Sequence, residues 1–176
     1  MPIVPDTKDW TWVLERTCPE CDFDVRGFPR AEIGSMIRAA AERWREVLAR
    51  PGVGARPRED VWSPLEYGCH VRDVFDVYHK RLQLMLEADD PEFPNWDQDA
   101  TAIEQRYAEQ DPNRVVDELG AAAEALAASF DSVDDDQWQR TGGRDDGANF
   151  TVESLARYMI HDPIHHLHDA GYRSNG

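Results

Sequence analysis

The sequence contains few basic residues, and lysine is almost absent from it. Lysine occurs only as Lys8 and Lys80, and the 19 lysine and arginine residues are outnumbered by 35 aspartate and glutamate residues, which gives a formal net charge of −16. A chain this negative repels phosphate backbones and anionic membrane surfaces. We therefore expect neither a nucleic-acid partner nor a membrane-surface partner.

Long apolar runs are also lacking. No stretch reaches the roughly 18 consecutive apolar residues that suggest a membrane-spanning helix. The N-terminus has no basic segment followed by an apolar core, which is the pattern of a secretory signal peptide. The default expectation is a cytoplasmic protein, and 176 residues suffice for one ordinary domain.

Cysteine is scarce, with Cys18, Cys21 and Cys69 as the three members. An odd number of cysteines in a chain without a signal peptide does not describe a disulfide framework. Cys18-x-x-Cys21 has the spacing of a redox pair or of half a zinc site, but no second pair completes four ligands nearby in the sequence. The favoured interpretation is two structural thiols. A redox pair and a second metal site, completed by Cys69 or a histidine, remain open alternatives.

Apolar residues recur every three or four positions along most of the chain. This periodicity predicts helices over residues 30–50, 63–85, 111–133 and 151–168. Ser63, Pro64 and Glu66 form a helix-start signature with a capping box. Pro163 lies inside the last predicted helix, where it removes a backbone donor and should kink the helix.

The segments between these helices have weaker signals. Residues 10–15 alternate enough to suggest a short extended piece, residues 100–109 a short extra helix, and the glycine-rich residues 141–149 a loop. The predicted fold is all-α, a four-helix bundle with a long connection between the second and third helices. Residues 1–29 are expected to form an irregular N-terminal extension, and residues 30–176 the bundle domain.

Three histidines suggest a metal site. His161 and His165 are one helical turn apart and face the same way, so both imidazoles can bind one metal ion. His70 lies on the apolar stripe of the second predicted helix and is a candidate third ligand from a distant segment. Three neutral imidazoles would leave coordination positions open, as in catalytic rather than structural zinc sites.

Several neighbours could support such a centre. Glu66 and Asp73 lie about one turn on either side of His70, where a carboxylate could orient a ligand or act as a base. His168 faces broadly the same way as His161 and is a candidate supporting residue or alternative ligand. His166 is interpreted as an ordinary side chain.

Two motifs resemble a known family. The residues Trp62-Ser63-Pro64-Leu65-Glu66 precede His70, and Phe150-Thr151-Val152 leads into His161-x-x-x-His165, and this order is similar to the DinB/YfiT-like superfamily of metal-binding four-helix bundles. The resemblance covers residues 29–171. It implies that His70, His161 and His165 bind a metal together with water. Members include bacterial S-transferases that use mycothiol or bacillithiol, and a mycothiol-dependent maleylpyruvate isomerase.

The function expected from these observations is metal-dependent transfer of a low-molecular-weight thiol, such as mycothiol, to a small-molecule electrophile. The expected cofactor is a divalent metal, with zinc first and nickel or iron as alternatives. A metal can hold a thiol as thiolate or activate water, so the sequence does not separate transfer from hydrolysis. The alternative is a non-catalytic bundle that the metal stabilises and that binds a small ligand or a protein partner. A homodimer is left open.

Overall fold

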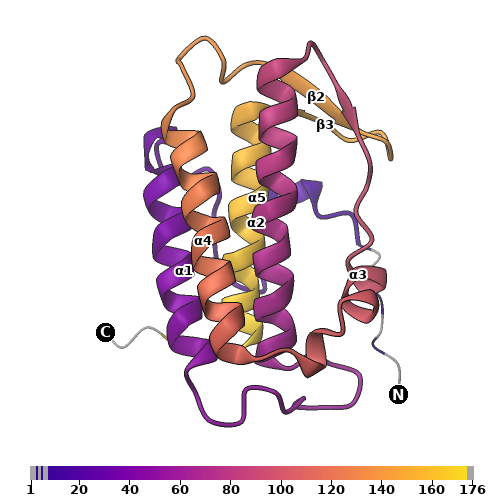
Figure 1. Ribbon diagram of the computed structural model, residues 1–176. Coiled ribbons are helices and arrows are strands. Elements are labelled where there is room, and N and C mark those ends of the chain that lie inside the picture. The colour runs from indigo at the N-terminus through magenta and orange to yellow at the C-terminus, as the bar shows by residue number, and fades with distance from the viewer. Residues whose placement is uncertain (1–2, 4, 6–7, 174–176) are drawn as a thin grey trace.

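Four long helices form the body of the molecule (Figure 1). The computed structural model describes residues 3, 5 and 8–173. The long helices are α1 (Ile33–Leu48), α2 (Pro64–Glu87), α4 (Pro112–Asp131) and α5 (Val152–Asp169). They confirm the four predicted helices and the all-α bundle. No helix in the described part of the chain is long and apolar enough to cross a membrane.

The helices do not pack in sequence order. α1 and α2 each pack mainly on α4 and α5 rather than on each other. The long connection over residues 88–111 returns the chain to the start of α4, so α2 and α4 run in the same direction (Figure 1). Trp44, Phe75 and Phe130 are almost fully excluded from solvent at the centre of the bundle. The long connection between the second and third bundle helices is therefore confirmed.

The start of α2 is fixed by the predicted capping box. The Ser63 hydroxyl accepts a hydrogen bond from the backbone N–H of Glu66 at 3.2 Å, and the Glu66 carboxylate accepts one from the backbone N–H of Ser63 at 2.8 Å. Pro64 occupies the first helical position, where its missing N–H has no cost. This cap sets where α2 begins.

A small sheet lies beside one end of the bundle (Figure 1). Its strands are β1 (Glu92–Phe93), β2 (Thr141–Arg144) and β3 (Asn149–Thr151), with β1 parallel and β3 antiparallel to β2. The predicted loop over residues 141–149 is thus a hairpin. Glycine permits it, because a Cβ on Gly142 would lie 2.8 Å from Met85 Cγ. The rest of the long connection contains α3 (Gln98–Glu104) and the 3-10 turn η3 (Tyr107–Glu109).

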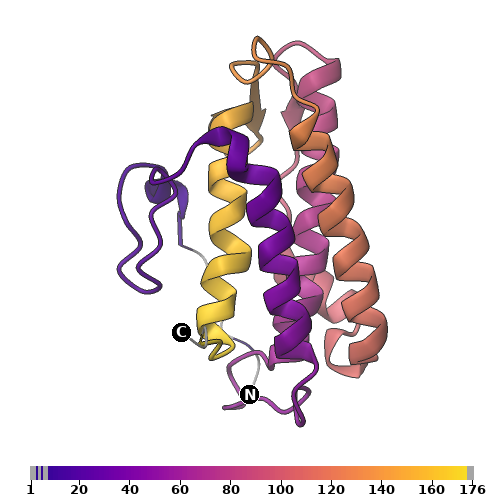
Figure 2. The ribbon, with the colours of Figure 1, turned by 90° about the vertical axis from the view of Figure 1, so that its left-hand side faces the viewer.

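The N-terminal segment lies along α5 (Figure 2). Its first element is the 3-10 turn η1 (Thr11–Leu14), and a second such turn, η2 (Arg30–Glu32), leads into α1. The prediction of an extended piece over residues 10–15 was wrong. Asp9 explains the difference, because its carboxylate accepts hydrogen bonds from the backbone N–H and the hydroxyl of Thr11 and so starts a turn.

Candidate metal centre

Helix α5 carries two neighbouring pairs of metal-binding side chains. His161 and His165 form one pair, and Asp162 and His166 form the other, each with four-residue spacing. Because one residue corresponds to about 100° of rotation, the two pairs face different directions from the same helix. The helix continues through Pro163. One pair can therefore face α2 while the other faces the N-terminal segment.

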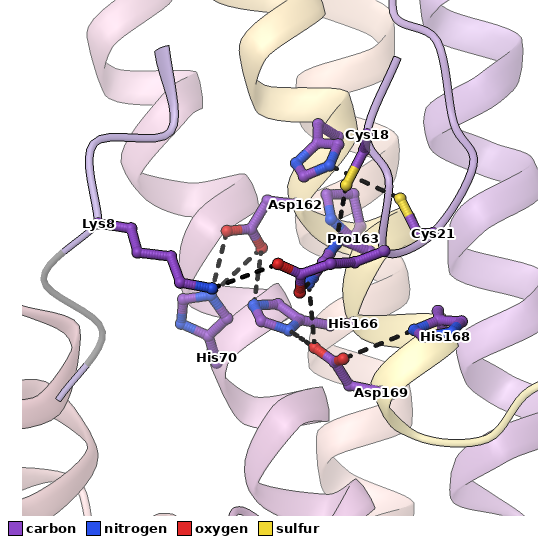
Figure 3. A network of polar contacts seen from close by, with 12 residues as sticks. Lys8, Cys18, Cys21, His70, Asp162, Pro163, His166, His168 and Asp169 are labelled. Carbon is purple, nitrogen blue, oxygen red and sulfur yellow. Dashed lines mark hydrogen bonds and ion pairs between the residues drawn. The ribbon is translucent and has the colours of Figure 1, made fainter. Parts of the chain in front are cut away.

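The pair Asp162 and His166 meets His70 of α2. His70 is fully buried, and its Nε2 lies 3.2 Å from Asp162 Oδ1 and 3.3 Å from Asp162 Oδ2. The rings of His70 and His166 meet edge to face, with centroids 4.9 Å apart. One donor atom from each of the three residues lies within 4.8 Å of the other two. This group, which we call the His70 group, is visible in Figure 3.

The charges in the His70 group suit a cation. Burial alone raises the pKa of Asp162, but His70 and His166 outweigh it and hold that pKa well below its usual range. The carboxyl is therefore ionised at neutral pH. Apart from the 3.2 Å contact with His70 Nε2, Asp162 Oδ1 is buried without a hydrogen-bond partner among the described residues, and His70 Nδ1 is likewise buried without one. A bound cation would satisfy the Asp162 oxygen, and two imidazoles with one carboxylate are a donor set that catalytic zinc and non-haem iron both use.

Neighbouring side chains hold the two imidazoles in place. The Nδ1 of His166 donates a hydrogen bond to Asp169 at 2.8 Å, and its Nε2 lies 3.8 Å from Asp162 Oδ1. Tyr67 stacks on the ring of His166 at a centroid distance of 4.8 Å. Trp96, from the long connection before α3, stacks on His70 at 5.3 Å. The hydrogen bond from His166 to Asp169 is typical of an imidazole that binds a metal through one nitrogen and is oriented through the other, whereas His70 is held by ring packing.

The His70 group opens onto a cavity of about 1000 Å³. Asp162 and His166 line it, and the side chain of Asp162 is 31% exposed. Trp62 and Trp96 form part of the wall nearest His70. A metal held by three protein ligands at this position would face open space, as catalytic sites require.

A buried arginine also lines this cavity. Arg81 is 6% exposed, donates a hydrogen bond to the carbonyl of Pro94 and lies over the rings of Tyr78 and Phe93. Burial lowers its pKa, and no described carboxylate lies within ion-pair distance of it. The nearby Arg144, by contrast, pairs with Asp146 at 2.8 Å. The wall around Arg81 is therefore a place where an anionic group would compensate a buried charge.

The other pair of α5 faces the N-terminal segment. Cys18 Sγ lies 3.7 Å from His165 Nδ1, and Cys21 Sγ lies 3.7 Å from His161 Nε2. Donor atoms of all four residues lie within 4.8 Å of one another. The structure thus divides the three predicted histidines between two groups, since His70 meets Asp162 and His166 rather than His161 and His165. The difference comes from the rotation of α5, where a shift of one residue changes the face.

The predicted supporting residues have other roles. Glu66 pairs with Arg56 and caps α2, and Asp73 pairs with Arg72 at 2.8 Å and accepts a hydrogen bond from the Tyr107 hydroxyl. The side chain of His168 is 59% exposed. None of Glu66, Asp73 and His168 belongs to either group of donor atoms.

Sequence reasoning missed Asp162, His166 and Asp169. The signal for the first two was present, because Asp162-x-x-x-His166 has the same four-residue spacing as the histidine pair beside it. Histidine spacing alone does not reveal that an aspartate occupies a possible ligand position. Asp169 had no recognisable signal beyond its place one turn after His165 and His166.

Acid should destabilise the metal-free protein through His161. Burial, together with the neighbouring His165, lowers the pKa of His161 from 6.5 to about 4. Between these values the unfolded chain binds a proton that the folded chain does not. The stabilising contribution is therefore complete above pH 6.5 and is lost as the pH falls toward 4.

Thermal unfolding in a chelator at several pH values measures this effect. The variant His161→Gln should lose less stability than the parent protein across this pH window. Equal losses in the two proteins would contradict the assignment of the effect to His161.

Comparisons with known proteins identify the family. The model of the DinB superfamily matches residues 36–170, which is most of the chain. Among solved structures, the fold is similar to YfiT from Bacillus subtilis, a probable metal-dependent hydrolase with an unusual four-helix bundle topology. The TM-score is 0.70 at 17% sequence identity, and the match covers 79% of this chain and 82% of that one. A search of curated proteins found no match. The chain belongs to the DinB superfamily.

Proposed function

We propose that this DinB superfamily member is a metal-dependent enzyme whose divalent metal binds His70, Asp162 and His166. The observation that carries the proposal is the convergence of these three donors, one of them an unsatisfied carboxylate oxygen, at the wall of a large cavity. Two imidazoles and a carboxylate suit zinc or iron(II). A metal in this position lowers the pKa of a thiol or water and so supplies a nucleophile at neutral pH.

Side chains around the His70 group have separate roles in this proposal. Trp62 and Trp96 contact His70 and keep bulk water from its ring. Asp169 keeps the proton of His166 on Nδ1, so that Nε2 is unprotonated and its lone pair can bind the metal. Arg81 binds an anionic group of the substrate in the same cavity.

Thiol transfer is the first candidate reaction. A cavity of about 1000 Å³ lies at the upper end of the range for small-molecule sites, which leaves room for a low-molecular-weight thiol beside an electrophile. His70 and Arg81 are eleven residues apart on α2, which corresponds to roughly 16 Å along the helix axis. An electrophile with a carboxylate or phosphate at one end would span part of that distance. We therefore propose an anionic electrophile as substrate.

Hydrolysis is the second candidate, and the structural similarity to YfiT favours it. It needs the same three ligands and the same cavity, with water in place of the thiol. A purely structural metal at the His70 group is less favoured, because a structural site is closed by a fourth protein ligand and this group contains three.

Activity assays with and without metal separate these functions. Purified protein loaded with zinc or with iron(II), and metal-free protein, are incubated with mycothiol or bacillithiol and a panel of anionic and neutral electrophiles. We expect thiol consumption only in a metal-loaded sample. Equal rates with and without metal would contradict an enzymatic role of the metal, and ester or amide cleavage without thiol would select hydrolysis.

The variant Arg81→Met tests the substrate class. It removes the positive charge while keeping a long apolar side chain, so KM for anionic electrophiles should rise and KM for neutral ones should change little. We expect a rise of at least about 10-fold, because a hydrogen bond to a charged group contributes about 1.5–3 kcal/mol. An equal change for both classes would contradict anion recognition by Arg81.

A further inference from the structure

We propose that Cys18, Cys21, His161 and His165 bind one zinc ion in a closed structural site, separate from the His70 group. Cys-x-x-Cys and His-x-x-x-His are the ligand spacings of Cys2His2 zinc sites, although here the two halves are 140 residues apart in the chain. The fold brings them together because the N-terminal segment lies along α5 (Figure 2). This site is independent of the proposed function.

The distances fit tetrahedral zinc. With Zn–S bonds of about 2.3 Å and Zn–N bonds of about 2.05 Å, tetrahedral angles place each sulfur roughly 3.6 Å from each nitrogen. Cys18 Sγ to His165 Nδ1 and Cys21 Sγ to His161 Nε2 are both 3.7 Å. All four donor atoms lie within 4.8 Å of one another, and all three cysteines of the chain are free thiols.

The ring nitrogen of His165 that does not face the cysteines lies near carboxylates, as is common for zinc-binding histidines. Its Nδ1 faces Cys18, while its Nε2 lies 3.6 Å from Asp169 and 3.7 Å from Glu20. Carboxylates on the outer nitrogen fix the ring and increase its basicity. Asp169 contacts both His165 and His166, so it connects the two groups (Figure 3).

The site is largely shielded from solvent, with Cys21 half-buried and with His161 and His165 at the edge of the cavity. Cys18 is fully buried, and His161 and His165 are 4% and 6% exposed. Trp10 lies against both imidazoles, with centroid distances of 5.5 Å to His161 and 5.0 Å to His165. Four ligands without an open position are the arrangement of a structural zinc.

Zinc at this site would hold one wall of the substrate cavity. The N-terminal segment has little regular structure and contributes Lys8, Asp9, Trp10 and Glu20 to the cavity lining. Binding Cys18 and Cys21 to α5 fixes that segment against the bundle. The structural metal would therefore help to shape the cavity.

Cobalt substitution tests the site directly, because thiolate bound to cobalt(II) absorbs in the near ultraviolet. The reduced parent protein should bind two cobalt ions per chain and show this band. The double variant Cys18→Ser with Cys21→Ser should bind one cobalt ion and lose the thiolate band. The variant His70→Ala should also bind one cobalt ion, but it should keep the thiolate band. Cys69→Ser is the matched control, since Cys69 is a buried thiol outside both groups, and it should resemble the parent.

A second measurement covers the case in which the double variant does not fold. In the Cys69→Ser background, a thiol reagent should leave Cys18 and Cys21 unmodified while zinc is bound and should modify both after a chelator is added. Absence of the thiolate band in reduced, cobalt-loaded protein, or equal thiol reactivity with and without zinc, would overturn the proposal. If the cysteine variant loses a metal and His70→Ala does not, this site stands and the proposed catalytic centre fails.

Discussion

Replacing His70 with alanine should remove the metal from the His70 group and abolish metal-dependent turnover. Asp162 and His166 would remain as a two-ligand site on one helix, which binds divalent metals poorly. Changes to residues that merely orient a ligand already lower metal affinity by about 10–100-fold, so loss of a ligand should lower it by at least about 100-fold. Titration against a competing chromophoric chelator measures the affinity.

The control for this variant is His79→Ala on the same helix. His79 is half-buried, bonds to the Ser129 hydroxyl and lies outside both donor groups. Its replacement should leave metal affinity and turnover near those of the parent. Unchanged metal stoichiometry together with full activity in a folded His70→Ala protein would contradict metal binding by the His70 group.

Replacing Trp44 with alanine should destabilise the fold by about 3–5 kcal/mol, the usual cost of removing a large buried aromatic side chain. Trp44 of α1 is fully buried, and its indole N–H donates a 3.0 Å hydrogen bond to the carbonyl of Pro163 in α5. It therefore joins α1 to the helix that carries both pairs of candidate ligands. Denaturant unfolding of the metal-free protein measures the free energy change.

Trp44→Phe separates packing from the hydrogen bond. Phenylalanine keeps most of the buried apolar surface and loses the donor, so its effect should be clearly smaller than that of alanine. An alanine variant destabilised by less than about 1 kcal/mol would contradict the role of Trp44 as a core residue.

The helices and their starts were predictable because their signals are local. Apolar periodicity located the four long helices, and Ser63, Pro64 and Glu66 predicted the cap that the structure contains. The burial of His70 was predictable as well, because His70 lies on the apolar stripe of this helix. Helix existence and caps depend on residues within one or two turns, and these are visible in the sequence.

The division of the ligands was not predictable for a geometric reason. Residues 161–166 contain two pairs with four-residue spacing, and only the rotation of α5 against α2 decides which pair meets His70. That rotation depends on packing between distant segments, such as the hydrogen bond from Trp44 of α1 to the carbonyl of Pro163. The approach of Cys18 to His165 spans 147 residues, and no local pattern encodes it.

The glycine-rich hairpin has a similar explanation. Its residues suggested a loop because glycine is unfavourable in strands. Gly142 of β2 lies so close to Met85 that a larger residue would clash, and this contact between distant segments is not visible in the local sequence. The turn at residues 11–14 depends on Asp9, whose carboxylate accepts a hydrogen bond from the backbone N–H of Thr11. The alternating pattern of residues 10–15 favoured an extended segment instead, although Asp9 is a local turn signal.

The most direct measurement is anomalous diffraction from crystals of zinc-loaded protein, with data collected on both sides of the zinc absorption edge. We expect one anomalous peak about 2.0–2.2 Å from donor atoms of His70, Asp162 and His166, at the wall of the cavity. A second peak is expected among Cys18, Cys21, His161 and His165. A single peak bound by His70 together with His161 and His165, or no peak beside His70, would contradict the account.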